Sequence, residues 1–387
     1  MPRSPLLASA LAGLVAAGLL SPAATAAQAA GPAYEFEIVA DSVEDRFDPF
    51  NTGCASINTA GDIGFRAGRV APDGFNTVDG IYRADAGSEG LVTIAEHEDR
   101  LQSIGNNPSM NDAGQVSFAA SLERDGEAIL RGAGGPLTVI ARTEPGRFNF
   151  FGFDTSVNDE GRVAFKAELD RSDGFDEGLF SGAGNAVATH YRASTSKFDG
   201  SDSRPAINDP GDIAFTESVN FDDGVFVTRR AGFRTVSPPD PEVGVGRPEL
   251  NNLGVLAFER SCSDPATDEF VTQIVSGRGA PFEIQASTRG RFSFFGFRPP
   301  AINNSGIVAF HGTLDDFNTS GVYVGPRPAR PVVRTGDVID GDPVSNVVFC
   351  EEGINDSGQL AFVATLNDPE APDGTRIVWV RATPTAG

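Results

Sequence analysis

Three arginines hold equivalent positions ahead of a recurring sequence pattern. Arg204, Arg247 and Arg298 each stand four or five residues before an asparagine that opens the pattern Asn-x-x-Gly. A guanidinium group presents a planar fork of donors that matches carboxylate, sulfate and phosphate oxygens. If the fold brings the three side chains together, they could bind an anion. Their alternative role is ion pairing with the many carboxylates of the chain.

Acidic residues occupy the corresponding place in other copies of the pattern. Asp154 precedes one copy by four residues, and Glu351 precedes another by four. A site with a basic half and an acidic half could orient a polar ligand such as an acidic sugar. The candidate ligand-binding residues are therefore Arg204, Arg247, Arg298, Asp154 and Glu351.

Two Phe-rich segments are near-copies of each other. Residues 147–153 read RFNFFGF and residues 291–297 read RFSFFGF. Exposed aromatic rings would offer stacking platforms to sugars or an apolar patch to a protein. Phenylalanine has no polar group, however, so the sequence favours packing between strands for these side chains.

Signals for catalysis or metal binding are weak. The chain has three histidines, His97, His190 and His311, and none accompanies a serine or cysteine in a nucleophile motif. Acidic hairpins such as Asp222–Gly224 and Asp315–Asp316 could hold calcium, but their spacing matches no calcium loop, and hairpin turns need the same residues. We expect no catalytic residue, no metal site and no cofactor, although calcium binding is left open. Whether the chain is an enzyme is uncertain, and the sequence favours a protein without enzymatic activity.

The pattern that follows the arginines is part of an internal repeat. Asn-x-x-Gly-x-x-small-Phe occurs seven times, at steps of 43 to 53 residues. The Asn and Gly pairs are Asn58 and Gly61, Asn111 and Gly114, Asn158 and Gly161, Asn208 and Gly211, Asn251 and Gly254, Asn303 and Gly306, and Asn355 and Gly358. Asn at the first and Gly at the fourth position suit a type I turn in a bulged hairpin. The turn is flanked by an apolar residue and by alternating strand residues.

The number and length of the repeats predict the architecture. Each unit has room for four short strands, and seven such units predict an all-β, seven-bladed β-propeller. With the first strand of each unit innermost, the three arginines would converge near the axis, at one mouth of the ring. Residues 31–381 would form this single domain, followed by a short tail at 382–387, and we expect a monomer.

The two ends of the chain predict how the ring closes. The last unit has three strands, while residues 34–40 read as a spare fourth strand. We expect this N-terminal strand to complete the last blade, which leaves no open sheet edge. Cys54 and Cys350 lie at nearly equivalent positions in the first and last units, so they are a candidate disulfide across the closure. Cys262 would then be unpaired.

Residues 1–30 read as an export signal. Arg3 is the only charge, an apolar run covers Leu6–Leu20, and cleavage could follow Ala26 or Ala30. The run is too short to favour a membrane-spanning helix. The formal net charge of −23 argues against nucleic acid and anionic membranes as partners. The expected location is outside the cell or in the cell envelope.

Together with the export signal, copies such as NDEGRVAF, NDPGDIAF, NNSGIVAF and NDSGQLAF resemble the bacterial exported proteins with NxxGxxAF tandem repeats. The resemblance covers roughly residues 34–381. Gly64 and Ser117 replace the usual alanine in the first two copies, and Arg260 replaces an apolar residue in the fifth. The resemblance implies the fold and export, and it implies no activity.

The sequence therefore favours an exported, non-catalytic binding propeller that recognises an anionic glycan or a protein of the cell envelope. The alternative is a polysaccharide hydrolase or lyase with its site at one mouth. A purely structural surface protein is a third class. An Arg-rich pocket with a well-placed histidine or carboxylate pair would favour the enzyme, and a plugged channel with featureless rims would favour the structural role.

Overall fold

The computed structural model describes residues 33–71, 77–97, 101–124, 126–171, 176–200, 204–229, 232–264, 267–296 and 298–385. The chain divides into two compact units, residues 1–31 and residues 32–387, and all described residues belong to the second. The predicted export signal with both cleavage positions lies outside the described residues. Within the described part, no helix has the length and apolar character needed to cross a membrane.

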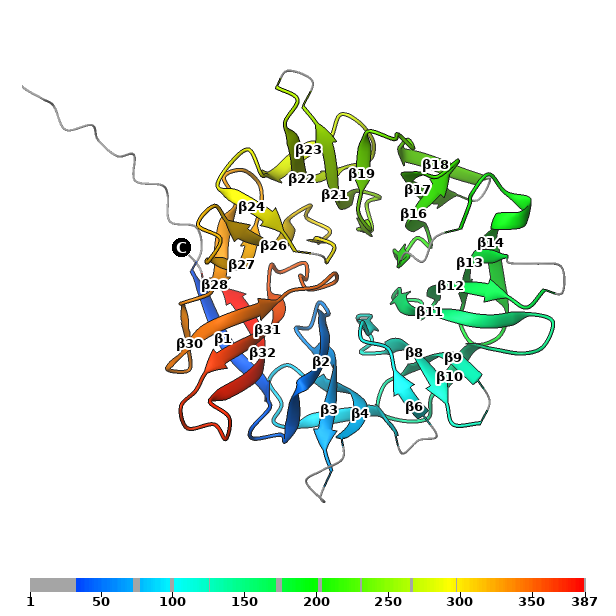
Figure 1. The fold of residues 1–387 in the computed structure, drawn as a ribbon. Helices are drawn as coiled ribbons and strands as arrows, with labels where there is room; N and C mark the ends of the chain where they lie inside the picture. The colour runs from blue at the N-terminus through cyan, green and yellow to red at the C-terminus, as the bar shows by residue number, and fades with distance from the viewer. Residues whose placement is uncertain are drawn as a thin grey trace, which may run out of the picture. The chain divides into compact units, whose positions relative to one another are not determined.

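The second unit is the predicted all-β propeller, with seven blades of four strands arranged in a ring (Figure 1). Blade 1 is β2 (Phe47–Ile57), β3 (Ile63–Val70), β4 (Thr77–Ala84) and β5 (Leu91–Glu96). Blade 2 is β6 (Leu101–Ile104) with β7 (Ser109–Met110), β8 (Val116–Leu122), β9 (Gly126–Gly132) and β10 (Thr138–Arg142). Blade 3 is β11 (Phe148–Val157), β12 (Val163–Leu169), β13 (Glu177–Gly182) and β14 (Val187–Arg192), and one 3-10 turn, η2 (Ala193–Thr195), follows it.

The remaining blades follow the same order. Blade 4 is β15 (Ala206–Ile207), β16 (Ile213–Val219), β17 (Asp222–Arg229) and β18 (Gly232–Ser237). Blade 5 is β19 (Val243–Val245) with β20 (Glu249–Leu250), β21 (Leu256–Ser263), β22 (Phe270–Gly277) and β23 (Glu283–Ser287). Blade 6 is β24 (Phe292–Phe295) with β25 (Ala301–Ile302), β26 (Val308–Leu314), β27 (Ser320–Val324) and β28 (Arg330–Arg334). Blade 7 is β30 (Asp342–Val348) with β29 (Val338–Ile339), β31 (Leu360–Asn367), β32 (Thr375–Pro384) and β1 (Tyr34–Asp41).

The repeated motif forms the turn between the first and second strands of every blade. In each copy the Gly N–H donates to the Asn carbonyl at 2.8–3.0 Å. The seven glycines have φ between 68° and 88°, a left-handed conformation that glycine adopts at little cost. In all seven copies Asn Oδ1 accepts a hydrogen bond at 2.8–3.0 Å from the backbone N–H four residues later. Both ends of the turn are therefore held by the residue types that the motif repeats.

The last two positions of the motif build the core between blades. The motif phenylalanines are at most 1% exposed; they are Phe65, Phe118, Phe165, Phe215, Phe258, Phe310 and Phe362. The small residue before each of them faces the neighbouring blade. At Gly64 an added Cβ would lie 3.2 Å from Met110 Sδ, so the bulk of Met110 explains glycine in this copy.

The Phe-rich segments are partly packed and partly exposed. Phe148, Phe151, Phe292 and Phe295 are at most 4% exposed and contact the motif phenylalanines of their own blades. The packing interpretation holds for these four residues. Other rings of the two segments, Phe150, Phe153 and Phe294, are 36–55% exposed. Phe297 lies outside the described residues.

The N-terminal strand closes the ring as predicted. β1 pairs antiparallel with β32, from Tyr34 opposite Pro384 to Asp41 opposite Val378, and the two strands lie side by side in Figure 1. Because β1 begins at Tyr34, its partner continues to Pro384. Residues 382–384, which the sequence assigned to a tail, therefore belong to the last blade.

A disulfide joins the first and last blades in the structure. Cys54 and Cys350 are bonded, with their Cα atoms 5.8 Å apart, and each residue is 2% exposed. Asn355 Nδ2 also donates to the carbonyl of Asn58 at 2.9 Å across the same junction. Cys262 is half-buried and outside any disulfide of the described residues. Blades 7 and 1 are thus connected by a covalent bond and by the motif itself.

Candidate functional site

Irregularities in the first strands place the residues ahead of each motif at the axis. In blade 3, Phe151 pairs with Ala167 and Thr155 with Phe165, so the first strand holds two extra residues, and Asp154 lies among them. In blade 6, Phe295 pairs with Gly312 and Ala301 with Ala309, and Arg298 lies in the longer segment. Such bulges change the direction in which side chains point and recur beside functional sites.

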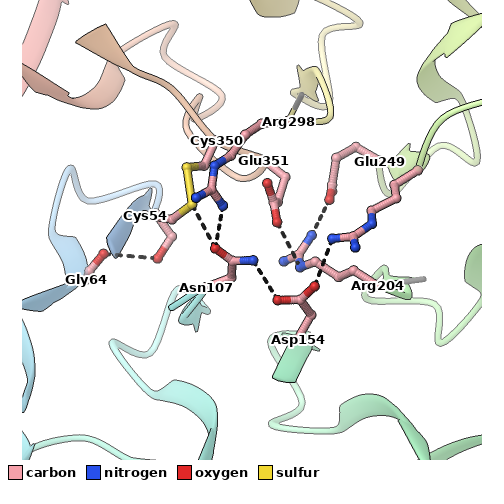
Figure 2. Close-up of a disulfide and its surroundings, with 11 residues drawn as sticks. Cys54, Gly64, Asn107, Asp154, Arg204, Glu249, Arg298, Cys350 and Glu351 are labelled. Atoms are coloured by element: carbon pink, nitrogen blue, oxygen red, sulfur yellow. Dashed lines mark hydrogen bonds and ion pairs between the residues drawn. A yellow bond between two sulfur atoms is a disulfide. The ribbon is translucent and has the colours of Figure 1, made fainter. Parts of the chain in front are cut away.

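Arg204 lies at the centre of a buried charge cluster, drawn in Figure 2. The residue is 3% exposed. Its guanidinium bonds Glu249, lies 3.3 Å from Glu351 Oε1, and donates to Glu352 Oε1 at 2.6 Å. Its Nε also donates to the carbonyl of Thr155 at 3.2 Å. Four blades meet through this one side chain.

Glu352 reaches across the axis from blade 7. Besides Arg204, its Oε1 accepts hydrogen bonds from Ser109 Oγ at 2.8 Å and Ser156 Oγ at 3.2 Å, on blades 2 and 3. Its backbone is in the left-handed region, with φ of 60°. This conformation is uncommon outside glycine and is kept where surrounding contacts hold it. Arg204, Glu249, Glu351 and Glu352 therefore form a plug, by which name we refer to them below.

Burial and mutual charge shift the titration of the plug. Burial raises the pKa of Glu249 to about 8, helped by the charges of Glu352 and Glu351 and opposed by Arg204. Burial alone would lower the pKa of Arg204, but the carboxylates of Glu352, Glu249 and Glu351 outweigh it and raise the pKa above its usual value. Arg204 is therefore charged, and Glu249 binds its proton more tightly than an ordinary glutamate does.

A second group of polar side chains, linked by hydrogen bonds, lies at the mouth of the channel. Arg247 Nη1 donates to Asp154 Oδ2 at 2.9 Å. Asn107 Nδ2 donates to Asp154 Oδ1 at 2.6 Å, and Arg298 Nη1 donates to Asn107 Oδ1 at 2.6 Å. Figure 2 shows Asn107 between Arg298 and Asp154. We call Arg247, Asp154, Asn107 and Arg298 the mouth network.

The arginines of the mouth network differ from Arg204 in exposure. The Arg247 side chain is 41% exposed, and Arg298 is an exposed residue. Within the network, Arg247 donates one hydrogen bond to Asp154 and Arg298 donates one to Asn107, whereas a guanidinium carries five N–H donors. Both arginines can therefore still donate to a ligand at the mouth.

The structure brings all five predicted ligand residues to the axis, but in two groups that differ in burial. Arg204 and Glu351 belong to the plug, and Arg247, Arg298 and Asp154 to the mouth network. Sequence reasoning missed Asn107, Glu249 and Glu352. Asn107 stands four residues before Asn111, the position used for the others, and could have been found. Glu352 reaches the axis through its left-handed backbone, for which the repeat gives no signal.

The other end of the channel is formed by the motif turns. A cavity of about 160 Å³ is lined by the Asn of all seven copies and also by Glu249 and Glu352 of the plug. Six of the seven motif asparagines donate from Nδ2 to the carbonyl of the next motif asparagine at 2.9–3.2 Å. Asn58 Nδ2 donates to Asp62 Oδ2.

A second ring of bonds runs through the residue after each motif asparagine. In six junctions its backbone N–H donates at 2.8–2.9 Å to Oδ1 of the matching Asp or Asn in the next blade. Burial raises the pKa of Asp159, in this ring, to about 6, and the nearby charges of Asp209 and Asp112 add to the shift. We call these two sets of bonds the motif ring.

The histidines lie outside these axial structures. His190 Nε2 is 2.9 Å from Ser181 Oγ, and burial, with a smaller contribution from Arg162, lowers its pKa. Burial also lowers the pKa of His311, whose Nδ1 is buried without a partner. His97 is half-buried. None of the three belongs to the plug, the mouth network or the lining of the axial cavity.

Among the described residues, Cys54, Cys350 and Glu351 each place an atom that could coordinate a metal ion within 4.8 Å of the other two. Both sulfurs are committed to the disulfide, so this group does not fit a metal ion. Calcium binding by the acidic hairpins at Asp222–Gly224 and Asp315–Asp316 remains a prediction.

Several solved structures share the fold. The polysaccharide lyase Uly1 matches with a TM-score of 0.52 and 8% identity over 87% of this chain and 90% of the lyase. The acylaminoacyl peptidase of Pyrococcus horikoshii matches with a TM-score of 0.50 and 7% identity over 82% of this chain, which spans about half (49%) of the peptidase. A putative TolB from Agrobacterium tumefaciens matches with a TM-score of 0.43 and 12% identity over 76% of this chain and 95% of that protein. At these identities the first two matches show the fold alone, and the third, with its lower TM-score, carries no argument.

No curated protein sequence matches the chain. A family model matches residues 16–146 and 57–383, which is most of the propeller and all seven motif copies. The chain therefore belongs to the family of unknown function DUF7453.

Proposed function

We propose that this propeller is an exported binding protein and that its mouth network recognises an acidic glycan. The observation that carries the proposal is the pair Arg247 and Arg298, whose guanidinium groups are accessible at the mouth of a plugged channel. Export and the narrower membership of the NxxGxxAF repeat proteins are parts of the same proposal. If none of the oligosaccharides in the experiment below binds, the alternative ligand is a protein of the cell envelope with a carboxylate-rich surface.

The two arginines are suited to bind an anionic ligand, because the side chains that now bond them compete only weakly with such a ligand. Exposed ion pairs contribute about 0–1 kcal/mol, so a ligand carboxylate or sulfate can replace Asp154 beside Arg247 at little cost. Arg298 is held by the neutral Asn107 and keeps its full charge. Asp154 and Asn107 then offer acceptors and donors for hydroxyl groups next to the anion.

Arg204 does not share this role. It is buried among Glu249, Glu351 and Glu352, and removing the cation from such a cluster costs stability rather than affinity. The earlier alternative of ion pairing between blades thus describes Arg204, while the ligand hypothesis is kept for Arg247 and Arg298.

The alternative function is that of a polysaccharide lyase or hydrolase. It is retained because a polysaccharide lyase has the same fold over nearly its whole length. Fold alone does not carry an activity. Assays for unsaturated products and for new reducing ends, run on every glycan that binds, separate a lyase or hydrolase from a binding protein.

The test is the affinity of the purified protein for an oligogalacturonate, a sulfated oligosaccharide and a neutral oligosaccharide of equal length. We expect saturable binding of an acidic oligosaccharide only. Arg247→Gln and Arg298→Gln should each weaken it about tenfold or more, since a hydrogen bond to a charged group contributes ~1.5–3 kcal/mol. Arg278→Gln, at an exposed arginine that bonds the carbonyl of Leu253 near the motif ring, is the control of equal charge. Equal losses in all three variants would contradict the proposed site.

A further inference from the structure

A basic hollow lies between blades 5 and 6 and shares no residue with the axial cavity or the mouth network. It has a volume of about 390 Å³. Arg289 and Arg291 reach it from the connection between β23 and β24, and Arg327 from the hairpin between β27 and β28. A volume of this size falls in the range of small-molecule sites, roughly 300–1,000 Å³.

Arg291 is held in place by neutral groups. Its Nη2 donates to the carbonyl of Ala329. Its guanidinium carbon lies 5.2 Å from the ring centres of both Phe292 and Tyr323, a cation–π arrangement. These contacts fix the guanidinium without neutralising it. A ligand that meets Arg291 therefore meets a positioned and uncompensated charge.

Arg327 supplies the second uncompensated charge. It is exposed and stands between Pro326 and Pro328, whose rings restrict the backbone around it. In the part of the chain that the structure describes, neither Arg291 nor Arg327 forms an ion pair. Arg289 differs, because it pairs with Asp264 and lies 3.6 Å from Glu269 Oε2. Arg289 thus contributes donors but little net charge.

The rest of the lining has no carboxylate. Ala286, Phe292, Pro328 and Ala329 form an apolar wall, while Gln285 and Ser287 are polar and neutral. Gln285 is 2% exposed, and its Nε2 donates to Ser276 Oγ at 2.9 Å, so its position is fixed. The lining carries three arginines and no acidic residue, so its charge balance is opposite to that of the whole chain, which has 53 acidic and 30 basic residues.

We propose that this hollow is a second binding site, for a small organic anion that consists of a carboxylate or sulfate group on a ring-sized body. Arg291 and Arg327 hold the anionic group, because guanidinium forks match such oxygens. The uncharged ring lies against Phe292, Pro328 and Ala329. An acidic sugar residue has this combination of one charged group and one compact ring.

The test is calorimetric titration of the full protein with galacturonate and with galactose 6-sulfate, and with galactose and inorganic sulfate as controls. We expect saturable binding of at least one acidic sugar, no binding of galactose, and weaker binding of inorganic sulfate. Arg327→Gln should weaken the binding of the sugar about tenfold or more. Arg327 is exposed, so this variant keeps the fold, which its unfolding midpoint verifies.

A matched control variant decides the location. Arg330→Gln removes the same charge from an exposed arginine three residues further along, outside the hollow. We expect it to bind the acidic sugar within twofold of the unmodified protein. Equal weakening by Arg330→Gln, unchanged binding by Arg327→Gln, or no saturable binding of either acidic sugar at millimolar concentration would overturn the proposal. These outcomes leave the first proposal standing, because its own test uses acidic oligosaccharides and variants of Arg247 and Arg298.

Discussion

The two ends of the channel are formed by the same seven strands, but they differ in how regular they are. At the motif ring, nearly every blade contributes the same residue and the same two hydrogen bonds to the next blade. At the mouth, the position four or five residues earlier holds Asn107, Asp154, Arg247 and Arg298, so four blades contribute three kinds of polar group. The ring is uniform because every junction has the same task. The mouth varies because its side chains do not have to connect neighbours in one fixed way.

This difference indicates where function can lie in a repeat protein. Repeated residues hold the blades together, so changing one affects stability. Residues that break the repeat while pointing at the axis are free to recognise a ligand. The plug is irregular but buried, so its variants test whether an irregular position is sufficient for ligand recognition or must also be exposed.

The largest effect on stability is expected at the plug. Arg204→Met should reduce the free energy of unfolding by about 3–5 kcal/mol, because it leaves Glu249, Glu351 and Glu352 buried without their cation. Chemical denaturation at neutral pH measures the loss. Arg298→Met, the same substitution at the exposed mouth, is the control and should cost below about 1 kcal/mol. Equal costs for the two variants would remove the distinction between plug and mouth.

The next largest effect is expected at the motif ring. Asn208→Ala removes an acceptor for the N–H of Asp212 at 2.9 Å and a donor to the carbonyl of Asn251 at 3.1 Å, from a side chain that is buried. Two buried bonds lost in this way should cost about 2–4 kcal/mol in denaturant unfolding. Asn318→Ala, at an exposed hairpin asparagine, is the matched control and should stay within about 0.5 kcal/mol. If both variants unfold alike, the ring of bonds does not hold the blades.

A smaller, pH-dependent effect is expected for Glu249→Gln. The folded pKa of Glu249 is raised from 4.5 to about 8, so between these values the folded protein keeps a proton that the unfolded chain releases. Stability from this group is complete below pH 4.5 and decreases as the pH rises toward 8. Glutamine imitates the protonated acid, so the variant should gain at least about 1 kcal/mol over the unmodified protein across this range, the value of one pKa unit. A difference in stability that stays constant with pH would show that Glu249 is ionised throughout.

The fold was predictable because it rests on features that repeat. Seven Asn and Gly pairs at regular steps specify seven hairpins, and the spare strand at residues 34–40 specifies the closing partner of β32. The end of β32 at Pro384 was not predicted, because it depends on where its partner begins. The convergence of Arg204, Arg247 and Arg298 also followed from their similar distance to the motif, four or five residues.

The division of these arginines into plug and mouth could not be predicted. It depends on Glu249 and Glu352, which neutralise Arg204 and reach the axis from different blades. Glu352 does so through a left-handed backbone, and blade 6 carries Arg298 one residue further from its motif than the others. These are single local departures, and a repeat pattern describes only what its copies share.

The central claim is that the mouth serves recognition while the motif ring serves stability. The most direct test measures both quantities, the dissociation constant for an acidic oligosaccharide and the free energy of unfolding, on two proteins: the double variant Arg247→Gln/Arg298→Gln and the single variant Asn208→Ala. We expect the double variant to lose affinity by tenfold or more while its unfolding free energy changes by below about 1 kcal/mol. We expect Asn208→Ala to keep its affinity and lose about 2–4 kcal/mol. A double variant that unfolds more easily but binds as before would contradict the account.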